Sequence, residues 1–434
     1  MNKAKKSIRI VIISNYDLYG GSSVAAYNLH TTLLKNGYKS LMIVQNKISN
    51  NPTVIQKENR INTWISNLIN NRWNFPYSYR VGIIARKLFA YFNDWYKSSL
   101  IEQYNLKQSN FYSILKFRPD IIHFNTGGGD NFFNLREIKT LSKFYKVVFS
   151  IHDLWIVTKD PPKISHNDSK KAATYKYHQI NQSKINFISH SKWVHNIIKN
   201  TRRLQNNSFH FIQHSIDTAK FRPLCKSKVR KKLGLQKDSF ILLTCAIGIL
   251  SNPYKDFKTL LNAYLKIIKG IKRDIFLIVI GDRKENLLLK EYEDKFIFVS
   301  SYTSSTELAE YYSSADLYIH SSHIETWGLA ISEALSCGIP AIASSVGAIP
   351  EQIRGYSRGI KNELLNLYQL NYANGFLFER KDSETLYALI LWCLKNEKDL
   401  KILGKNARKF AKTHLDINKQ IPNYIDYYRK LLSK

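Results

Sequence analysis

Acidic residues are scarce in this sequence of 434 residues. Asp and Glu number 33 together, against 65 Lys and Arg, which gives a formal net charge of +32. So basic a surface attracts polyanions such as nucleic acid, anionic lipid or phosphorylated substrates. No zinc-finger spacing, RNP motif or isolated basic helix is present, so we expect no specific nucleic-acid recognition. An anionic membrane surface fits better, although the even spread of Lys also fits simple compositional drift.

Cysteines and long apolar runs are also few. The four cysteines have no metal-ligand spacing and suggest no disulfide framework, which is typical of reduced thiols in the cytoplasm. No run of about 20 apolar residues occurs, so no transmembrane helix is expected. The apolar run at residues 8–13 contains Arg9 and precedes no small-residue cleavage site, so it predicts a first core strand rather than a signal peptide.

What the sequence does contain is an alternation of strand and helix patterns, in two series. Residues 8–14 are apolar, residues 23–35 have helical periodicity, and residues 41–44 are apolar again. A second series begins with an apolar segment at residues 240–246. The pattern predicts an α/β protein with two Rossmann-like domains that face each other across a cleft.

The chain is organised around residues 321–351. A helix is predicted over 329–336, because Gly338 stands at its C-terminal cap and Pro340 prevents continuation. Its N-terminus, at Gly328, favours an anion such as phosphate. Glu325 precedes the helix and Glu333 lies inside it, so one carboxylate can reach a sugar beside the phosphates and the other a ribose. The alternative is a helix with two solvated glutamates.

This stretch resembles the E-x7-E signature of family 4 glycosyltransferases, which have the GT-B fold, and the resemblance covers most of the chain. Gly328, Gly338-Ile339-Pro340 and Gly347 frame the two glutamates as in that family. The resemblance implies a retaining, metal-independent glycosyltransferase. Such an enzyme moves a sugar from a nucleoside-diphosphate sugar to a glycan or lipid-linked glycan, with the nucleotide sugar as co-substrate and no cofactor. Surface polysaccharide biosynthesis is the expected setting.

The resemblance also assigns the donor site. Glu325 is the catalytic candidate that contacts hydroxyls of the donor sugar, and Glu333 binds the ribose. Lys255 neutralises the donor diphosphate, although Ile249 and Asp256 stand where the family usually has arginine and glycine. The remaining donor-binding residues contribute mainly backbone: Gly20, Gly21, Trp327, Gly328, Leu329 and Ala330. For Gly20 and Gly21, a tight turn without a ligand remains the alternative.

A second group of candidates follows the strands of the first series. Residues 118–125 predict a turn followed by a strand, and residues 147–151 predict a buried strand. The loops after parallel strands form the binding crevice of an α/β sheet. Asn125 and His152-Asp153 stand at those ends, in a segment that resembles the WcaC-like branch of family 4. We expect His152 to be catalytic, near the reacting carbon, and Asn125 and Asp153 to lie on the acceptor side.

Residues 1–222 are predicted to form the acceptor-side domain and residues 223–414 the nucleotide-sugar domain. Residues 415–434 are expected to be a helix that returns to the first domain, as in other GT-B chains. An insertion at about 46–110 mixes tryptophan with arginine and lysine, so it is either an interfacial membrane segment or a helical insertion packed on the domain. The expected location is the cytoplasm, with a peripheral position on the inner face of the cell membrane left open.

Two other classes of function remain. A phosphorylase-like GT-B enzyme with pyridoxal phosphate would need a Schiff-base lysine, for which no signature is visible. A non-catalytic protein of the same fold could bind anionic membranes or polyanions, and the residues at 249 and 256 are the support for it. The retention of Glu325, Glu333, His152 and Lys255 argues against such a loss of activity.

Overall fold

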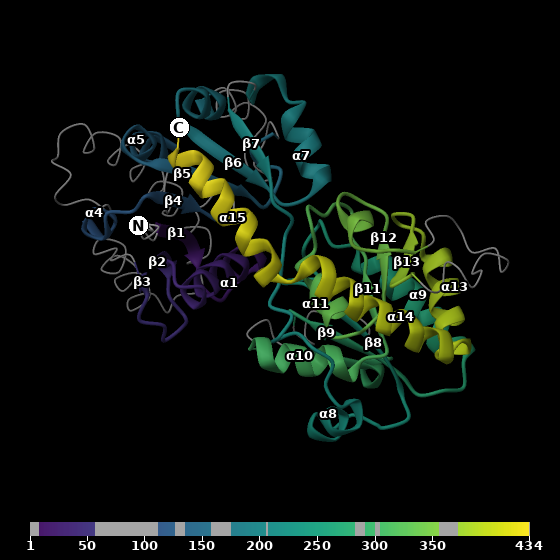
Figure 1. Cartoon of the computed structure of the whole chain (residues 1–434). Coiled ribbons are helices and arrows are strands. Elements are labelled where there is room, and N and C mark those ends of the chain that lie inside the picture. The colour runs from purple at the N-terminus through teal and green to yellow at the C-terminus, as the bar shows by residue number, and fades with distance from the viewer. Residues whose placement is uncertain are drawn as a thin grey trace, which may run out of the picture.

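The computed structural model describes residues 8–56, 112–125, 135–157, 175–204, 207–282, 291–299, 304–355 and 372–433. These residues form two α/β domains that lie side by side, each built on a parallel sheet (Figure 1). The predicted fold class, two Rossmann-like domains, is confirmed.

The sheet of the N-terminal domain has the order β3-β2-β1-β4-β5-β6-β7, and every described pair is parallel. Its central strands are buried and mainly apolar, as expected where helices cover both faces. The predicted insertion begins with an edge strand, since Val54 is buried and pairs with Met42; its remainder from residue 57 lies outside the described residues. The strands are β1 Arg9–Tyr16, β2 Lys39–Asn46, β3 Val54–Gln56, β4 Ile121–Phe124, β5 Lys146–Ile151, β6 Ile185–Ser189 and β7 Ser208–Phe211.

The sheet of the C-terminal domain has the order β10-β9-β8-β11-β12-β13 and is also parallel. In both sheets the chain starts near the middle, runs to one edge and then returns to build the other half. Its strands are β8 Phe240–Cys245, β9 Ile275–Ile280, β10 Phe296–Val299, β11 Leu317–His320, β12 Ala341–Ser344 and β13 Gly375–Phe378.

Helices cover both faces of each sheet (Figure 1). In the N-terminal domain, α1 (Gly21–Lys35) packs on one face and α5 (Leu135–Phe144) and α7 (Lys192–Lys199) on the other. In the C-terminal domain, α9 (Phe257–Gly270) and α13 (Ser383–Lys395) cover one face. The opposite face carries α10 Ser305–Ser314, α11 Leu329–Ser336 and α14 Glu397–Phe410, while the short helices α4 Tyr112–Phe117 and α8 Lys226–Lys232 lie at the periphery.

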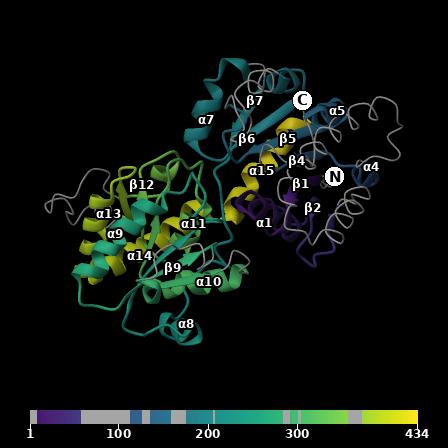
Figure 2. The same ribbon diagram turned by 180° about the vertical axis from the view of Figure 1, so that it is seen from behind.

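The chain crosses between the domains twice, and the two crossings touch. A π-helical turn at Ala411–Leu415 leads from α14 into α15 (Ile417–Leu432), which lies beside α1 on the N-terminal sheet (Figures 1 and 2). At the crossing, the amide of Ile216 donates to Leu415 and the amide of Ile417 donates to Ile216. The predicted boundary at 222/223 lies just after the first crossing. No described helix combines the length and apolarity that crossing a bilayer requires.

Each sheet reverses its strand order between two neighbours, β1 and β4 in the first domain and β8 and β11 in the second. In open α/β sheets the crevice beyond the carboxyl ends of such strands is where ligands bind. The fold therefore directs attention to the loops after these four strands.

Candidate active site

An ion pair between Lys255 and Glu325 lies at the switch point of the C-terminal sheet. The Lys255 Nζ is 2.5 Å from Oε2 of Glu325, and the two side chains are only 17% and 14% exposed. Burial alone would raise the pKa of Glu325, but the Lys255 ammonium and a hydrogen bond from His320 hold that pKa well below its ordinary value. Glu325 is therefore an ionised acceptor of hydrogen bonds at neutral pH.

The loop that carries Glu325 is fixed by backbone contacts. Lys255 and Ser322 form an isolated antiparallel bridge, which brings the lysine loop alongside the loop after β11. The amide of Ala348 donates to the Glu325 carbonyl at 3.0 Å, and a Cβ at Gly347 would stand 2.0 Å from that oxygen. Gly347 is thus required for the close approach of the two loops.

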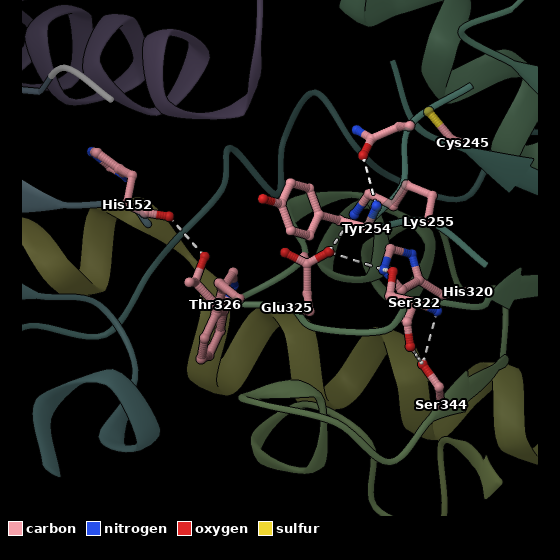
Figure 3. Close-up of polar contacts among 12 residues, drawn as sticks. His152, Cys245, Tyr254, Lys255, His320, Ser322, Glu325, Thr326 and Ser344 are labelled. Carbon is pink, nitrogen blue, oxygen red and sulfur yellow. Dashed lines mark hydrogen bonds and ion pairs between the residues drawn. The ribbon is translucent and has the colours of Figure 1, made fainter. Parts of the chain in front are cut away.

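His320 also contacts the Glu325 carboxylate. Its Nε2 lies 3.1 Å from Oε2 of Glu325 (Figure 3). Its Nδ1 lies 3.1 Å from the Tyr318 hydroxyl. Burial and then the neighbouring Lys255 lower the pKa of His320, while Glu325 opposes the shift. A carboxylate can only accept, so Nε2 carries the proton that points at Glu325.

Glu333, one turn inside α11, occupies a different environment from Glu325. It is 8% exposed, and no cation pairs with it in the described part of the chain. The Tyr312 hydroxyl donates to its Oε2 at 3.0 Å. Burial raises the pKa of Glu333 to about 8, and the hydrogen bond from Tyr312 offsets only part of that rise. Glu333 therefore takes up or releases its proton near neutral pH.

Two helix N-termini, one from each domain, meet beside these glutamates. Gly20 caps α1 and Gly328 caps α11, both with positive φ, and no side chain caps either helix. A Cβ on Gly21 would lie 3.3 Å from the Leu329 side chain, so the two termini are in contact. Free amides and two helix dipoles directed at one place favour an anion there.

Three histidine rings form the N-terminal wall. His152 follows β5, and its ring centroid lies 5.0 Å from that of His190 and 5.4 Å from that of His214. Its Nε2 is 3.1 Å from Oδ1 of Asn125. Burial, and then the neighbouring histidines, lower the pKa of His152 well below the ordinary value, so the ring is neutral.

Thr326 ties this wall to the glutamate loop. The Thr326 hydroxyl donates to the His152 carbonyl at 2.7 Å, across the two domains (Figure 3). Asp153 instead accepts from the Trp155 amide at 3.0 Å, within its own turn.

One cavity of about 400 Å³ unites these groups. Most predicted site residues line it, whereas Asn125 stands behind His152 and Asp153 is not part of the lining. Trp327 contributes little through its side chain, which is 3% exposed and donates to Ser332. The predicted residues that line the cavity are Gly20, Gly21, His152, Lys255, Glu325, Trp327, Gly328, Leu329, Ala330 and Glu333.

The two departures from the family pattern have structural explanations. Ile249 is 3% exposed and belongs to the apolar core under α9. Asp256 is the N-cap of α9, where it accepts from the amide and hydroxyl of Thr259. Among the described residues that line the cavity, Lys255 is the one lysine or arginine.

Sequence reasoning missed several contributors to this site. His190 and His214 follow β6 and β7, so the argument that singled out His152, a polar residue at the carboxyl end of a strand, would have found them. His320 ends β11 and could have been found in the same way. Tyr312 carried no such signal, because it lies within α10 and reaches Glu333 only through packing.

Comparisons with known proteins bear on the family and the fold of this chain. Residues 226–410 match the family model described as "Glycosyl transferases group 1". N-acetyl-alpha-D-glucosaminyl L-malate synthase of Bacillus anthracis is 24% identical over 248 residues, 55% of this chain. The chain spans only 58% of the length of that relative.

Solved structures resemble the whole chain. Sucrose-phosphate synthase from Thermosynechococcus elongatus superposes with a TM-score of 0.69 at 17% identity, over 98% of this chain and 99% of the other. Anabaena HepE, solved in complex with UDP-glucose, superposes with a TM-score of 0.62 at 15% identity, over 97% and 100%. At such identities the likeness establishes the fold. Residues 226–410 therefore resemble a group 1 glycosyl transferase domain, and the chain has the GT-B fold.

Proposed function

We propose that this chain transfers a sugar from a nucleoside-diphosphate sugar to a hydroxyl of a glycan or lipid-linked glycan, with retention of configuration. The observation that carries the proposal is the convergence of the α1 and α11 N-termini, without side-chain caps, on the cavity that holds Lys255, Glu325 and Glu333. A diphosphate needs two sets of donors, and one helix from each domain supplies them. The donor would thus bind between the domains.

The two glutamates would take different parts of the donor. Glu325 is ionised and anchored through one oxygen by Lys255 and His320, so it presents an acceptor to sugar hydroxyls. Glu333 lies deeper, beside Cys245 at the end of β8, where a ribose would follow the phosphates. Each would accept hydrogen bonds from neutral hydroxyl groups.

The chemical step breaks the bond between the anomeric carbon and the diphosphate, joins that carbon to the acceptor oxygen and releases the acceptor hydroxyl proton. Negative charge develops on the leaving diphosphate oxygen. Lys255 and the amides at Gly328 and Gly21, which line the cavity, would stabilise that charge. The neutral His152 ring on the opposite wall would contact the sugar near the reacting carbon. These protein groups supply the stabilisation in a metal-independent mechanism.

The test is thermal shift and turnover against a panel of UDP-, GDP- and ADP-sugars, with and without glycan acceptors. A ligand at 100 times its dissociation constant adds about 2.7 kcal/mol of stability, which is readily measured. We expect one nucleotide class to stabilise the wild type and Glu333→Ala to weaken that effect. Glu379→Gln, at an exposed glutamate of the same domain, is the matched control.

If no nucleotide sugar at millimolar concentration shifts the melting temperature, the transferase proposal fails. Binding of anionic vesicles or polyanions would then be the function to pursue. Assembly of a surface polysaccharide, on the inner face of the membrane, is part of the proposal and would be tested by the acceptors that support turnover.

A further inference from the structure

Four buried side chains form a row of hydrogen bonds that connects helix α15 to the N-terminal wall of the cleft. The Tyr428 hydroxyl on α15 lies 2.6 Å from Nδ1 of His123, and Nε2 of His123 lies 2.8 Å from Oγ of Ser150. The same Oγ is 2.8 Å from Nε2 of His190, whose Nδ1 is 2.9 Å from the Ile212 carbonyl. Tyr428, His123 and Ser150 are completely enclosed and His190 is 3% exposed.

The chemistry of these groups permits one arrangement of the protons. The Ile212 carbonyl can only accept, so Nδ1 of His190 carries the proton and Nε2 of the neutral ring accepts from Ser150. The single hydroxyl proton of Ser150 is then used, so Ser150 accepts from Nε2 of His123. Nδ1 of His123 is left as an acceptor, and the Tyr428 hydroxyl donates to it.

This arrangement depends on both histidines being neutral. Burial lowers the pKa of His190 to about 4, and burial followed by the proximity of His190 lowers the pKa of His123 to about 3. Both values lie far below neutral pH. A single carbonyl in the first domain therefore sets the orientation of every proton back to α15.

His190, the last side chain in this row of hydrogen bonds, lies at the cleft. The His190 ring stacks on that of His152, with centroids 5.0 Å apart and planes inclined by 26°, and lies 4.8 Å from the His214 ring. All three histidines line the cavity. A tilt of His190 changes its contact with His152, because the two rings stack on each other.

We propose that Tyr428 is a positioning residue for the proposed transferase reaction: through His123 and Ser150 it fixes the ring of His190 and thereby the ring of His152. The inference rests on the proposed function for its catalytic consequence. It gives α15 a part in the active site, although its Tyr428 lies 305 positions from His123 in sequence.

The test removes one hydroxyl. Tyr428→Phe deletes the hydroxyl that donates to His123, and Tyr424→Phe is the matched control. Tyr424 lies one turn earlier on α15 with its ring 6.1 Å from His123, and its hydroxyl donates to none of the described residues. Nitrogen-15 NMR of the imidazoles should show His190 as the Nδ1–H tautomer and His123 as the Nε2–H tautomer in the wild type.

In Tyr428→Phe we expect the His123, His190 and His152 signals to shift and kcat to fall about fivefold, the effect of one lost buried hydrogen bond, with KM for the donor unchanged. Tyr424→Phe should leave all of these at the wild-type values. Ser150→Ala removes the hydroxyl between His123 and His190, so it should shift the same His190 and His152 signals.

Opposite tautomers, or His152 signals that move equally in both tyrosine variants, would overturn the inference. The same holds for a loss confined to KM. If the wild type turns over no nucleotide sugar, only the proposed function fails. The tautomers and the His152 signals then still decide whether these hydrogen bonds position the His152 ring.

Discussion

The two walls of the cleft differ in how they handle charge. The C-terminal wall presents Lys255, Glu325 and Glu333, whereas the described lining of the N-terminal wall contains neutral histidines, hydroxyls and backbone but no Asp, Glu, Lys or Arg. In a chain with a net charge of +32, the N-terminal half of this pocket is uncharged where it is described. One wall is thus suited to a charged donor and the other to the neutral part of the reacting pair.

The walls also differ in how their side chains are held. On the charged wall, Glu325 depends on two partners, Lys255 and His320, and removal of any one leaves a buried group without its match. On the neutral wall, the His152 and His190 rings are held by hydrogen bonds between neutral groups and by stacking. Substitutions on the charged wall should therefore have the larger effects.

The largest effect is expected for Glu325→Ala. It leaves Lys255 and His320 facing an empty position and removes the acceptor proposed for the donor sugar. We expect kcat to fall by about 10²–10³-fold, the scale of losing one preorganised electrostatic contact. Steady-state turnover with the stabilising nucleotide sugar measures it, and Glu379→Gln should keep wild-type activity. If Glu325→Ala remains fully active, the charged wall does not carry the reaction.

Glu333→Gln should show opposite effects on binding and stability. The amide replaces one carboxyl oxygen with an NH2 group, which cannot accept a hydrogen bond from a ribose hydroxyl, so we expect nucleotide affinity to fall about tenfold. Between the ordinary glutamate pKa of 4.5 and about 8, folded Glu333 holds a proton that the unfolded chain has released. The wild type therefore loses stability as the pH rises across that window, whereas the glutamine variant does not.

Thermal melts from pH 4.5 to 8 check this sign. The variant should melt close to the wild type at the acidic end and several degrees higher at pH 8, since a buried charge kept for function costs stability. A difference in melting temperature that is constant across this range would show that Glu333 does not titrate in it.

The parts of this molecule that sequence predicts well depend on local pattern. The helix expected over 329–336 is observed as Leu329–Ser336, because Gly328 starts it and Gly338 and Pro340 end it within a few residues. The sequence also predicts that Glu325 and Glu333 share one site, because their spacing, a loop and one helical turn, is a local feature. Strand ends were similarly sufficient to bring His152 to the cleft.

What sequence did not predict depends on contacts between distant segments. The close approach of Gly347 to the Glu325 carbonyl joins two loops that no local pattern relates. Tyr428 and His123 lie in different parts of the chain, and no periodicity relates them. The pairing of Lys255 with Glu325 likewise required the bridge between two loops.

The smallest effect is expected where the two walls are held together. Oε1 and Oε2 of Glu351, in the C-terminal domain, accept from the amides of Trp193 and Lys192 at 2.8 and 2.9 Å. Ser191 caps the next amide of α7, that of Val194, so two of these three N-terminal amides are capped from the other domain. Glu351→Gln keeps one acceptor but loses the charge that favours this helix end.

A cap of this kind is worth about 1 kcal/mol. An arrangement in which the two domains have moved apart and this contact is broken should therefore become about fivefold more populated. We expect a larger radius of gyration by X-ray scattering in the absence of ligand, a KM for the donor raised a few-fold, and an unchanged kcat at saturation. Saturating nucleotide sugar should restore the wild-type scattering curve, because the donor contacts both walls. If Glu351→Gln instead lowers kcat as strongly as Glu325→Ala, then the walls do not act as separately held units, and the contrast between them loses its meaning for catalysis.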